Sequence, residues 1–147
     1  MLNDVYNKRI LGFAADIPRI GRLEDPDATA TAVSRLCGSK VTVDLKVRDG
    51  KVIDFAHDVK ACALGQASSS IMARTIIGAT PEELRAVGAR MRAMLKEDGP
   101  PPEGRWADLA VLEPVRDFKS RHASTLLTFD AVEDALAQIE ARATAAA

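Results

Sequence analysis

The chain has 147 residues, of which 47% are hydrophobic and 28% charged, so it is long enough to bury a core and too apolar to be disordered. The net charge is −1, and aromatic residues make up only 4% of the chain. This composition argues against a nucleic-acid-binding surface, which needs excess positive charge and stacking side chains. The length predicts a single domain over residues 1–147.

The N-terminal part of the sequence predicts one helix, a loop and a short strand. Apolar residues recur at helical spacing over residues 2–15, and Pro18 ends this pattern. Residues 21–27 are polar and are expected to form a loop, and residues 28–36 a short strand. No apolar run is long enough for a membrane span or a signal peptide, so we expect a cytoplasmic protein.

The clearest local pattern is a β-hairpin over residues 40–59. Apolar and polar residues alternate from residue 40 to residue 48, as in a half-buried strand. Asp49 and Gly50 then form a favoured two-residue turn. The predicted inward face of the returning strand consists of Ile53, Phe55, His57 and Val59.

Helical patterns dominate the rest of the chain. The predicted helices cover residues 63–77, 81–97, 106–112 and 126–143, with Pro114 ending the third and a polar connection over residues 115–122. The order of elements is therefore an N-terminal helix, a small three-stranded antiparallel sheet and a cluster of helices. This order is typical of an α+β fold.

The chain has only two cysteines, and the hairpin brings them together. Cys37 comes just before its first strand and Cys62 just after its second, so the open end of the hairpin makes them neighbours. Cys62 also precedes a predicted helix, whose free backbone N–H groups favour a thiolate. Thiolates bind metals and attack sulfur. The alternative is that both cysteines are small buried apolar residues.

The residues around these cysteines carry a family resemblance. Residues 36–40 read Leu-Cys-Gly-Ser-Lys, and Cys62 is followed after an interval by the run Ala-Ser-Ser-Ser over residues 67–70. Together with the hairpin, these segments resemble the NifU/IscU/SufU family of iron–sulfur cluster assembly scaffolds. The similarity continues through residues 6–23 and 112–121, and residues 89–112 resemble the insertion of the SufU-type branch.

The resemblance implies a metal-binding site that is altered in this chain. The family site uses three cysteines and an aspartate, and Cys37 and Cys62 match the first two cysteines. Ser39 stands where the family has the aspartate. The third cysteine is replaced by Ser124 in a gapless alignment or by Ala123 in an alignment with one gap.

The gapped alignment also matches His122 to a histidine of the family. The resemblance thus implies that Cys37 and Cys62 bind the cofactor, with His122 as a third metal ligand. The cofactor would be a transient iron–sulfur cluster or Zn²⁺, and a site without metal is a further alternative.

The function that the resemblance implies is that of a non-enzymatic scaffold or carrier. Its partners would be a cysteine desulfurase and acceptor apoproteins. One alternative is a zinc-dependent sulfur-transfer protein that receives a persulfide on Cys62, and another is a metal-free relative that binds the assembly machinery. Because one chain supplies fewer ligands than the family site uses, a homodimer that pools Cys37 and Cys62 from each chain is a further hypothesis.

Overall fold

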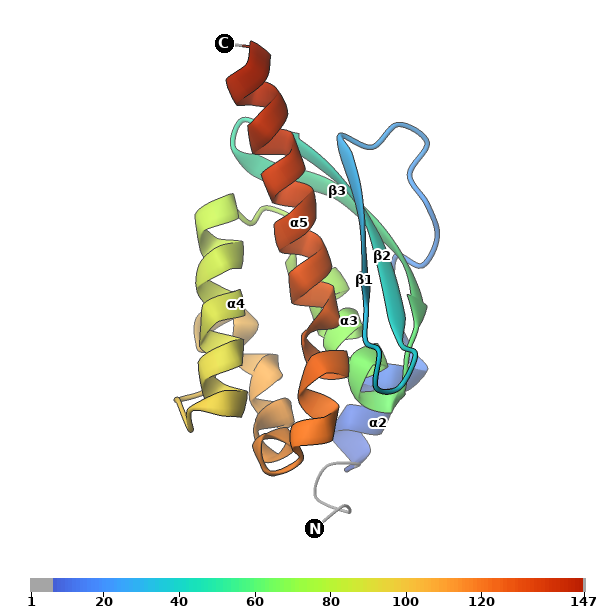
Figure 1. Cartoon of the computed structure of the whole chain (residues 1–147), viewed down its shortest axis with the longest axis vertical. Helices are drawn as coiled ribbons and strands as arrows, with labels where there is room; N and C mark the ends of the chain where they lie inside the picture. The colour runs from blue at the N-terminus through green and yellow to red at the C-terminus, as the bar shows by residue number, and fades with distance from the viewer. Residues whose placement is uncertain (1–6, 147) are drawn as a thin grey trace.

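A three-stranded antiparallel sheet packs against a group of helices in the computed structural model, which describes residues 7–146 (Figure 1). The elements in chain order are α2 (Lys8–Ala15), β1 (Ala28–Val33), β2 (Lys40–Arg48), β3 (Lys51–Lys60), α3 (Ala63–Thr75), α4 (Pro81–Lys96), η1 (Gly104–Asp117), η2 (Lys119–Arg121) and α5 (His122–Ala146). This order confirms the predicted α+β fold. The predicted start of the first helix, before residue 7, lies outside the described residues.

The sheet has the strand order β1-β2-β3, with both pairs antiparallel. Asp49 and Gly50 connect β2 to β3 with φ angles of 51° and 75°. Both angles are positive, as a tight hairpin turn of this kind requires. The hairpin over residues 40–59 is therefore confirmed.

The predicted inward face of the second hairpin strand is wrong at one residue, Ile53. Ile53 was expected to point inward, but it is 46% exposed, whereas Val52 is 1% exposed. The pairing register shifts between Lys46 and Val47, so Ile53 is the extra residue of a bulge on β3. After the bulge the alternation resumes, and Phe55 and His57 point inward as predicted.

The helix α5 is the element that joins the layers. It packs across β1 and β2 on one side and against α3 and α4 on the other. It begins at His122, four residues earlier than the pattern at residues 126–143 predicts. This earlier start matters for the site, because it makes residues 122–125 part of the helix.

The segment before α5 differs from the predicted short helix and polar connection. Residues Gly104–Asp117 form a 3₁₀ helix, η1, with Pro114 inside it. The buried apolar residues of this segment include Trp106, Leu109, Leu112 and Val115. They recur every third residue, which is the period of a 3₁₀ helix rather than that of an α-helix.

The loop after α2 is hydrogen-bonded to the sheet at His57. The backbone N–H of Gly21 donates to the His57 carbonyl at 2.9 Å, and the His57 N–H donates to the Arg19 carbonyl at 3.1 Å. The ring Nε2 of His57 lies 2.9 Å from the Pro18 carbonyl oxygen. Burial lowers the pKa of His57, although this carbonyl and Asp58 act in the opposite direction. His57 thus holds the loop to the sheet through both its backbone and its buried ring.

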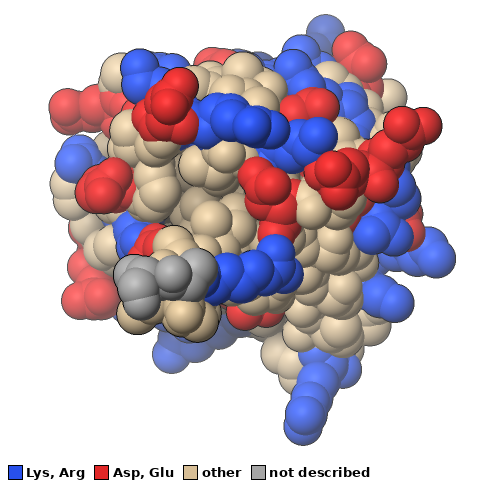
Figure 2. Space-filling model, turned by 90° about the horizontal axis from the view of Figure 1, so that it is seen from above, with Lys and Arg blue, Asp and Glu red and all other residues tan. Residues whose placement is uncertain are grey.

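Charged side chains of both signs occur on the surface, with uncharged side chains between them. Figure 2 shows lysine and arginine interspersed with aspartate and glutamate on the face seen from above. Among the helices within residues 7–146, none is both long and apolar enough to cross a membrane.

Candidate functional site

The turn between β1 and β2 presents Cys37 at the surface. The backbone N–H of Ser34 donates to the Ser39 carbonyl at 2.8 Å, and the N–H of Gly38 donates to the Ser34 carbonyl at 2.8 Å. Gly38 has a φ of +71°, a conformation that a residue with a side chain rarely adopts. These constraints hold Cys37 in an exposed position at the tip of the turn.

Cys62 occupies the residue immediately before α3, as predicted. Its carbonyl accepts a hydrogen bond from the Gln66 N–H at 2.9 Å, which closes the first helical turn. Its side chain makes no capping hydrogen bond to the helix. The sulfur is half-buried and free to interact with groups outside α3.

Ser39 joins the two cysteines. Its Oγ lies 2.9 Å from the Sγ of Cys37, and it accepts a hydrogen bond from the backbone N–H of Cys62 at 3.4 Å. The side chain of Ser39 is buried. The hairpin therefore brings the cysteines together, and Ser39 lies between them.

Ser124 reaches the site from the first turn of α5. The Sγ of Cys62 donates to the Ser124 Oγ at 3.4 Å, and that hydroxyl donates to the Arg121 carbonyl at 3.2 Å. The close approach of α5 to α3 depends on Gly65. A Cβ at Gly65 would lie 3.1 Å from the Ser124 carbonyl oxygen and 2.8 Å from the Ala61 Cβ.

His122 lies on a different side of α5. Residues two apart on a helix are separated by about 200°, so His122 and Ser124 point in nearly opposite directions. The Nε2 of His122 lies 3.1 Å from both the Val115 and the Arg116 carbonyl oxygens, and the ring lines a cavity with Lys96. The structure does not bring His122 to the cysteines, and its role as a metal ligand stays a prediction.

Hydroxyl groups favour the thiolate of Cys37. The hydrogen bond from Ser39 is the largest influence and lowers the pKa of Cys37, while burial opposes it. Ser34, whose Oγ lies 3.6 Å from the Cys37 sulfur, and Ser124 lower it further. Sequence reasoning missed Ser34, although the spacing Ser-x-x-Cys across a tight turn is a signal that could have found it.

The donor set of the site is two thiols surrounded by hydroxyl groups. Within residues 7–146, no three His, Cys, Asp or Glu side chains are grouped so that they could hold a metal ion. A serine hydroxyl loses its proton far less readily than a thiol and is a weak ligand beside it. Within residues 7–146 the site therefore offers two soft sulfur donors, which are of the kind that suits zinc or iron–sulfur species.

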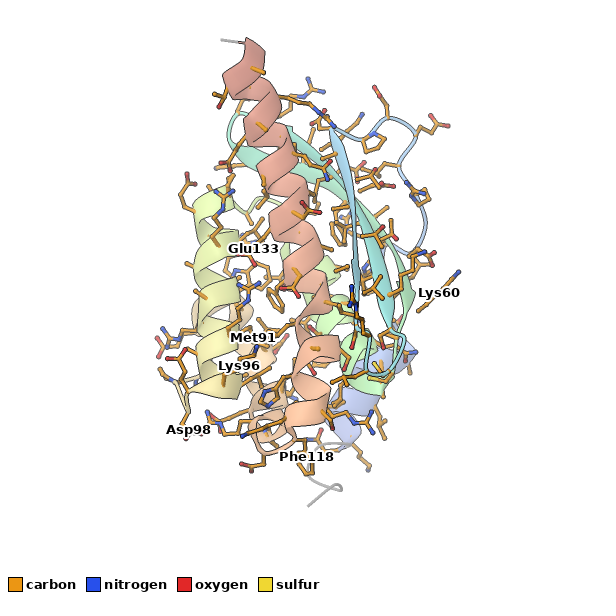
Figure 3. All side chains as sticks on the ribbon, in the orientation of Figure 1. Lys60, Met91, Lys96, Asp98, Phe118 and Glu133 are labelled. Carbon is orange, nitrogen blue, oxygen red and sulfur yellow. The ribbon has the colours of Figure 1, made fainter. Side chains whose placement is uncertain are left out.

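The rim of the site is both apolar and positively charged. Leu36 is 76% exposed and Val33 is 57% exposed, and both precede Cys37 in the chain. Lys40 and Lys60 face each other at the open end of the hairpin and are exposed. Figure 3 shows Lys60 extending away from the end of β3.

Comparison with known proteins identifies relatives over nearly the whole chain. Residues 5–145 match the family described as the NifU-like N-terminal domain. The iron–sulfur cluster assembly scaffold protein IscU of Thermotoga maritima is 27% identical over 135 residues, which cover 92% of this chain and 94% of the relative.

Solved structures extend this similarity. A NifU-like protein (N-terminal) from Brucella abortus is 68% identical, with a TM-score of 0.93 over 95% of this chain and 96% of that one. The putative SUF-system scaffold SufU of Fervidobacterium islandicum is 23% identical, with a TM-score of 0.83 over 90% of this chain and 96% of that one. At this identity the second likeness shows the shared fold alone.

Proposed function

Because the chain belongs to the NifU-like N-terminal domain family, we propose that it is an iron–sulfur cluster assembly scaffold that holds its cargo on Cys37 and Cys62. The relative from T. maritima, which carries the name of such a scaffold, matches this chain almost from end to end. The observation that carries the proposal is the pair of free thiols joined through Ser39 at one end of the sheet.

The surroundings of Cys37 suit the binding of iron and sulfide. Iron binds the thiolate, and the hydroxyl groups of Ser34, Ser39 and Ser124 favour that form. Cys37 is exposed, so cargo can enter and leave without any opening of the core. A scaffold has to release its cargo, and a surface site with few strong ligands allows that release. A cysteine desulfurase and acceptor apoproteins would be the partners that supply sulfur and take the cargo.

The test is metal and sulfide analysis of protein handled without oxygen. The protein is purified anaerobically and incubated with ferrous iron and sulfide, and iron, zinc and acid-labile sulfide are measured per chain. We expect near-stoichiometric iron and sulfide in the wild type and loss of most of both in Cys37→Ala and in Cys62→Ala. His122→Ala tests the predicted third ligand in the same assay.

Ser120→Ala is the matched control, because Ser120 is exposed and contacts neither sulfur. This variant should bind iron and sulfide as the wild type does. Wild-type protein that takes up neither metal nor sulfide would overturn the proposal. The metal-free relative that binds the assembly machinery would then be the better explanation.

A second candidate function is acceptance of sulfur from a desulfurase. The sequence suggested Cys62 as the acceptor, but the exposed, hydroxyl-stabilised thiol of Cys37 supports Cys37 instead. The Cys37 thiolate would attack the terminal sulfur of the donor's persulfide. A new sulfur–sulfur bond would form on Cys37, the donor's would break, and the donor would leave as a thiolate. Mass spectrometry after incubation with an active desulfurase and cysteine should then find one added sulfur atom on Cys37. An unmodified Cys37 would exclude this step.

A further inference from the structure

We infer that the cavity beside the start of α5 binds a phosphate ligand, either inorganic phosphate or a small phosphate ester. The cavity has a volume of about 490 Å³ and lies where the end of α4, the end of η1, η2 and the first residues of α5 meet. The residues that line it include neither cysteine, so the inference does not depend on the proposed function. Figure 3 shows Lys96 and Asp98 at the same end of the molecule as Phe118, which precedes Lys119 in the chain.

The first observation is positive charge that no nearby carboxylate neutralises. Lys96, in the last turn of α4, and Lys119, at the start of η2, are both exposed and both line the cavity. Neither forms an ion pair with another residue in the range 7–146. The negative end of the α4 dipole explains a cation at Lys96, but it does not explain Lys119, which comes from another element. Two ammonium groups on one cavity attract an anion that carries two negative charges.

The second observation is the hydrogen-bond acceptor that His122 provides. The side chain is 7% exposed, and its Nε2 lies 3.1 Å from two backbone carbonyl oxygens, so Nε2 carries the hydrogen. In the neutral ring, Nδ1 then has a lone pair, and it makes no hydrogen bond within residues 7–146. The ring lines the cavity, so Nδ1 is the nitrogen left for a ligand.

This acceptor selects among anions of the same shape and charge. Hydrogen phosphate has a hydroxyl group beside its negative charges, and a small phosphate ester can have one on its organic part. Either hydroxyl group can donate to Nδ1 of His122, while the charged oxygens interact with the lysines. Sulfate has the charge but no hydroxyl group, so it leaves Nδ1 without a partner.

The third observation is that Asp98 competes with a ligand for the same positive charge. Its carboxylate is 86% exposed and lies 3.9 Å from the Nε of Arg116, which is too far for a hydrogen bond. That Nε is buried and has no hydrogen-bond partner among the described residues. Arg116 is held instead by the Gly99 carbonyl at 2.8 Å and by Glu113 at 3.4 Å. Loss of the Asp98 charge should therefore strengthen the binding of an anion.

The experiment titrates the whole chain at constant ionic strength with inorganic phosphate, glycerol 3-phosphate and sulfate. Amide signals in ¹H–¹⁵N NMR spectra report where and how tightly each anion binds. We expect saturable shifts around residues 96–98 and 116–123 with the phosphate ligands. Sulfate should bind about threefold more weakly or worse, since it lacks one hydrogen bond. Whichever phosphate ligand binds more tightly identifies the source, inorganic phosphate or an ester.

Charge variants test whether the cavity is the site. Lys96→Gln and Lys119→Gln should each weaken phosphate binding about threefold, and Asp98→Asn should strengthen it about threefold, as exposed charge pairs typically do. Asparagine also tolerates the φ of 53° at residue 98. Lys51→Gln is the matched control, because Lys51 is exposed at the start of β3, at the opposite end of the molecule (Figure 1). It should bind phosphate as the wild type does.

Two results would overturn the inference. One is sulfate binding as tight as that of the phosphate ligands. The other is phosphate binding that Lys96→Gln and Lys119→Gln weaken no more than Lys51→Gln does. Cys37→Ala should bind phosphate as the wild type does while it loses iron and sulfide, so the failure of one proposal does not entail the failure of the other.

Discussion

Two polar clusters lie along β1 and β2, one buried around Asp44 and one at the surface around the two cysteines, and they differ in the strength of their hydrogen bonds. In the middle of the sheet, the fully buried Asp44 accepts from Arg22 at 2.7 and 3.1 Å, from the Leu23 N–H at 3.0 Å and from Thr29 at 2.5 Å. At the end of the sheet, the Sγ of Cys37 lies 2.9 Å from the Ser39 Oγ, and the Sγ of Cys62 donates to the Ser124 Oγ at 3.4 Å.

The difference separates a structural cluster from a binding cluster. The bonds to Asp44 are short and charge-assisted, and they fix the loop before β1 onto the sheet. The sulfur contacts are weaker, and they leave each thiol able to exchange a hydroxyl group for a metal. Removal of a side chain from the Asp44 cluster should therefore lower the stability of the protein. Removal of a hydroxyl group from the cysteine cluster should instead lower the reactivity of the thiols.

The largest expected effect is that of Asp44→Ala. This substitution removes the acceptor of four hydrogen bonds at once and leaves Thr29 and the Leu23 amide without it. We expect a loss of about 2–4 kcal/mol in the free energy of unfolding, measured by urea denaturation. Asp58→Ala, which removes an exposed carboxylate from β3, should change it by less than about 0.5 kcal/mol.

The pH dependence of the free energy of unfolding is a second test of the structural role of Asp44. Burial alone would raise the pKa of Asp44, but the hydrogen bonds from Arg22, Thr29 and the Leu23 amide together hold it below its usual value. The unfolded chain then takes up the proton first as the pH falls. The stability from Asp44 is complete above about pH 4 and is lost as the pH falls through the lower pKa of the folded state. Urea denaturation between neutral and acidic pH should show a shallower acid loss in Asp44→Ala.

A smaller effect is expected where the two helices of the thiol site meet. Gly65→Ala would place a Cβ 3.1 Å from the Ser124 carbonyl oxygen and 2.8 Å from the Ala61 Cβ. We expect a loss of about 1–3 kcal/mol in the free energy of unfolding, because both Ala61 and the start of α5 have to move away from the added methyl group. Ser124 should then leave Cys62, which would appear as weaker retention of iron and sulfide.

The control for Gly65→Ala is the same substitution at another helical glycine. Gly12 in α2 is exposed, and an added Cβ there would meet nothing within 4 Å. Gly12→Ala should stabilise the protein by about 0.5–1 kcal/mol, because alanine is the better helix former. If both variants gained stability, the contact between α3 and α5 would be looser than the geometry indicates.

Most of the fold was predictable because local patterns determine it. Alternation and the Asp49–Gly50 turn specify the hairpin, and helical periodicity specifies α3 and α4. The bulge at Ile53 was not predictable, because it depends on how β3 pairs with β2 rather than on β3 alone. The 3₁₀ helix η1 was missed because Pro114 was interpreted as a stop, although the apolar residues there recur every third position.

The two cysteines of the site were predictable from the residues themselves, whereas Ser39 and Ser124 were named only through the family resemblance. Cys37 and Cys62 follow from the hairpin, since its open end has to bring its flanking residues together. Ser124 comes from an element far away in the chain, and its contact with Cys62 depends on where α5 begins. The sequence left open whether Ser124 or Ala123 replaces the third cysteine, and that assignment stays a prediction; the structure shows that the Ser124 side chain reaches Cys62.

The smallest expected effect is on the reactivity of Cys37 in a variant of Ser39. It tests the cluster of Cys37, Cys62 and Ser39 most directly. The Ser39 hydroxyl is the main cause of the lowered pKa of Cys37, so Ser39→Ala should raise that pKa and reduce the thiolate present at neutral pH. We expect iodoacetamide to alkylate Cys37 about two- to tenfold more slowly, the range that one hydrogen bond to an exposed group supplies. Mass spectrometry of the labelled Cys37 peptide measures this rate, and Ser120→Ala should leave it unchanged.

The difference between the Ser39→Ala variant and the wild type should vanish at alkaline pH, where Cys37 is ionised in both. A deficit that persisted there would mean that Ser39 shapes the turn rather than the charge of the thiol.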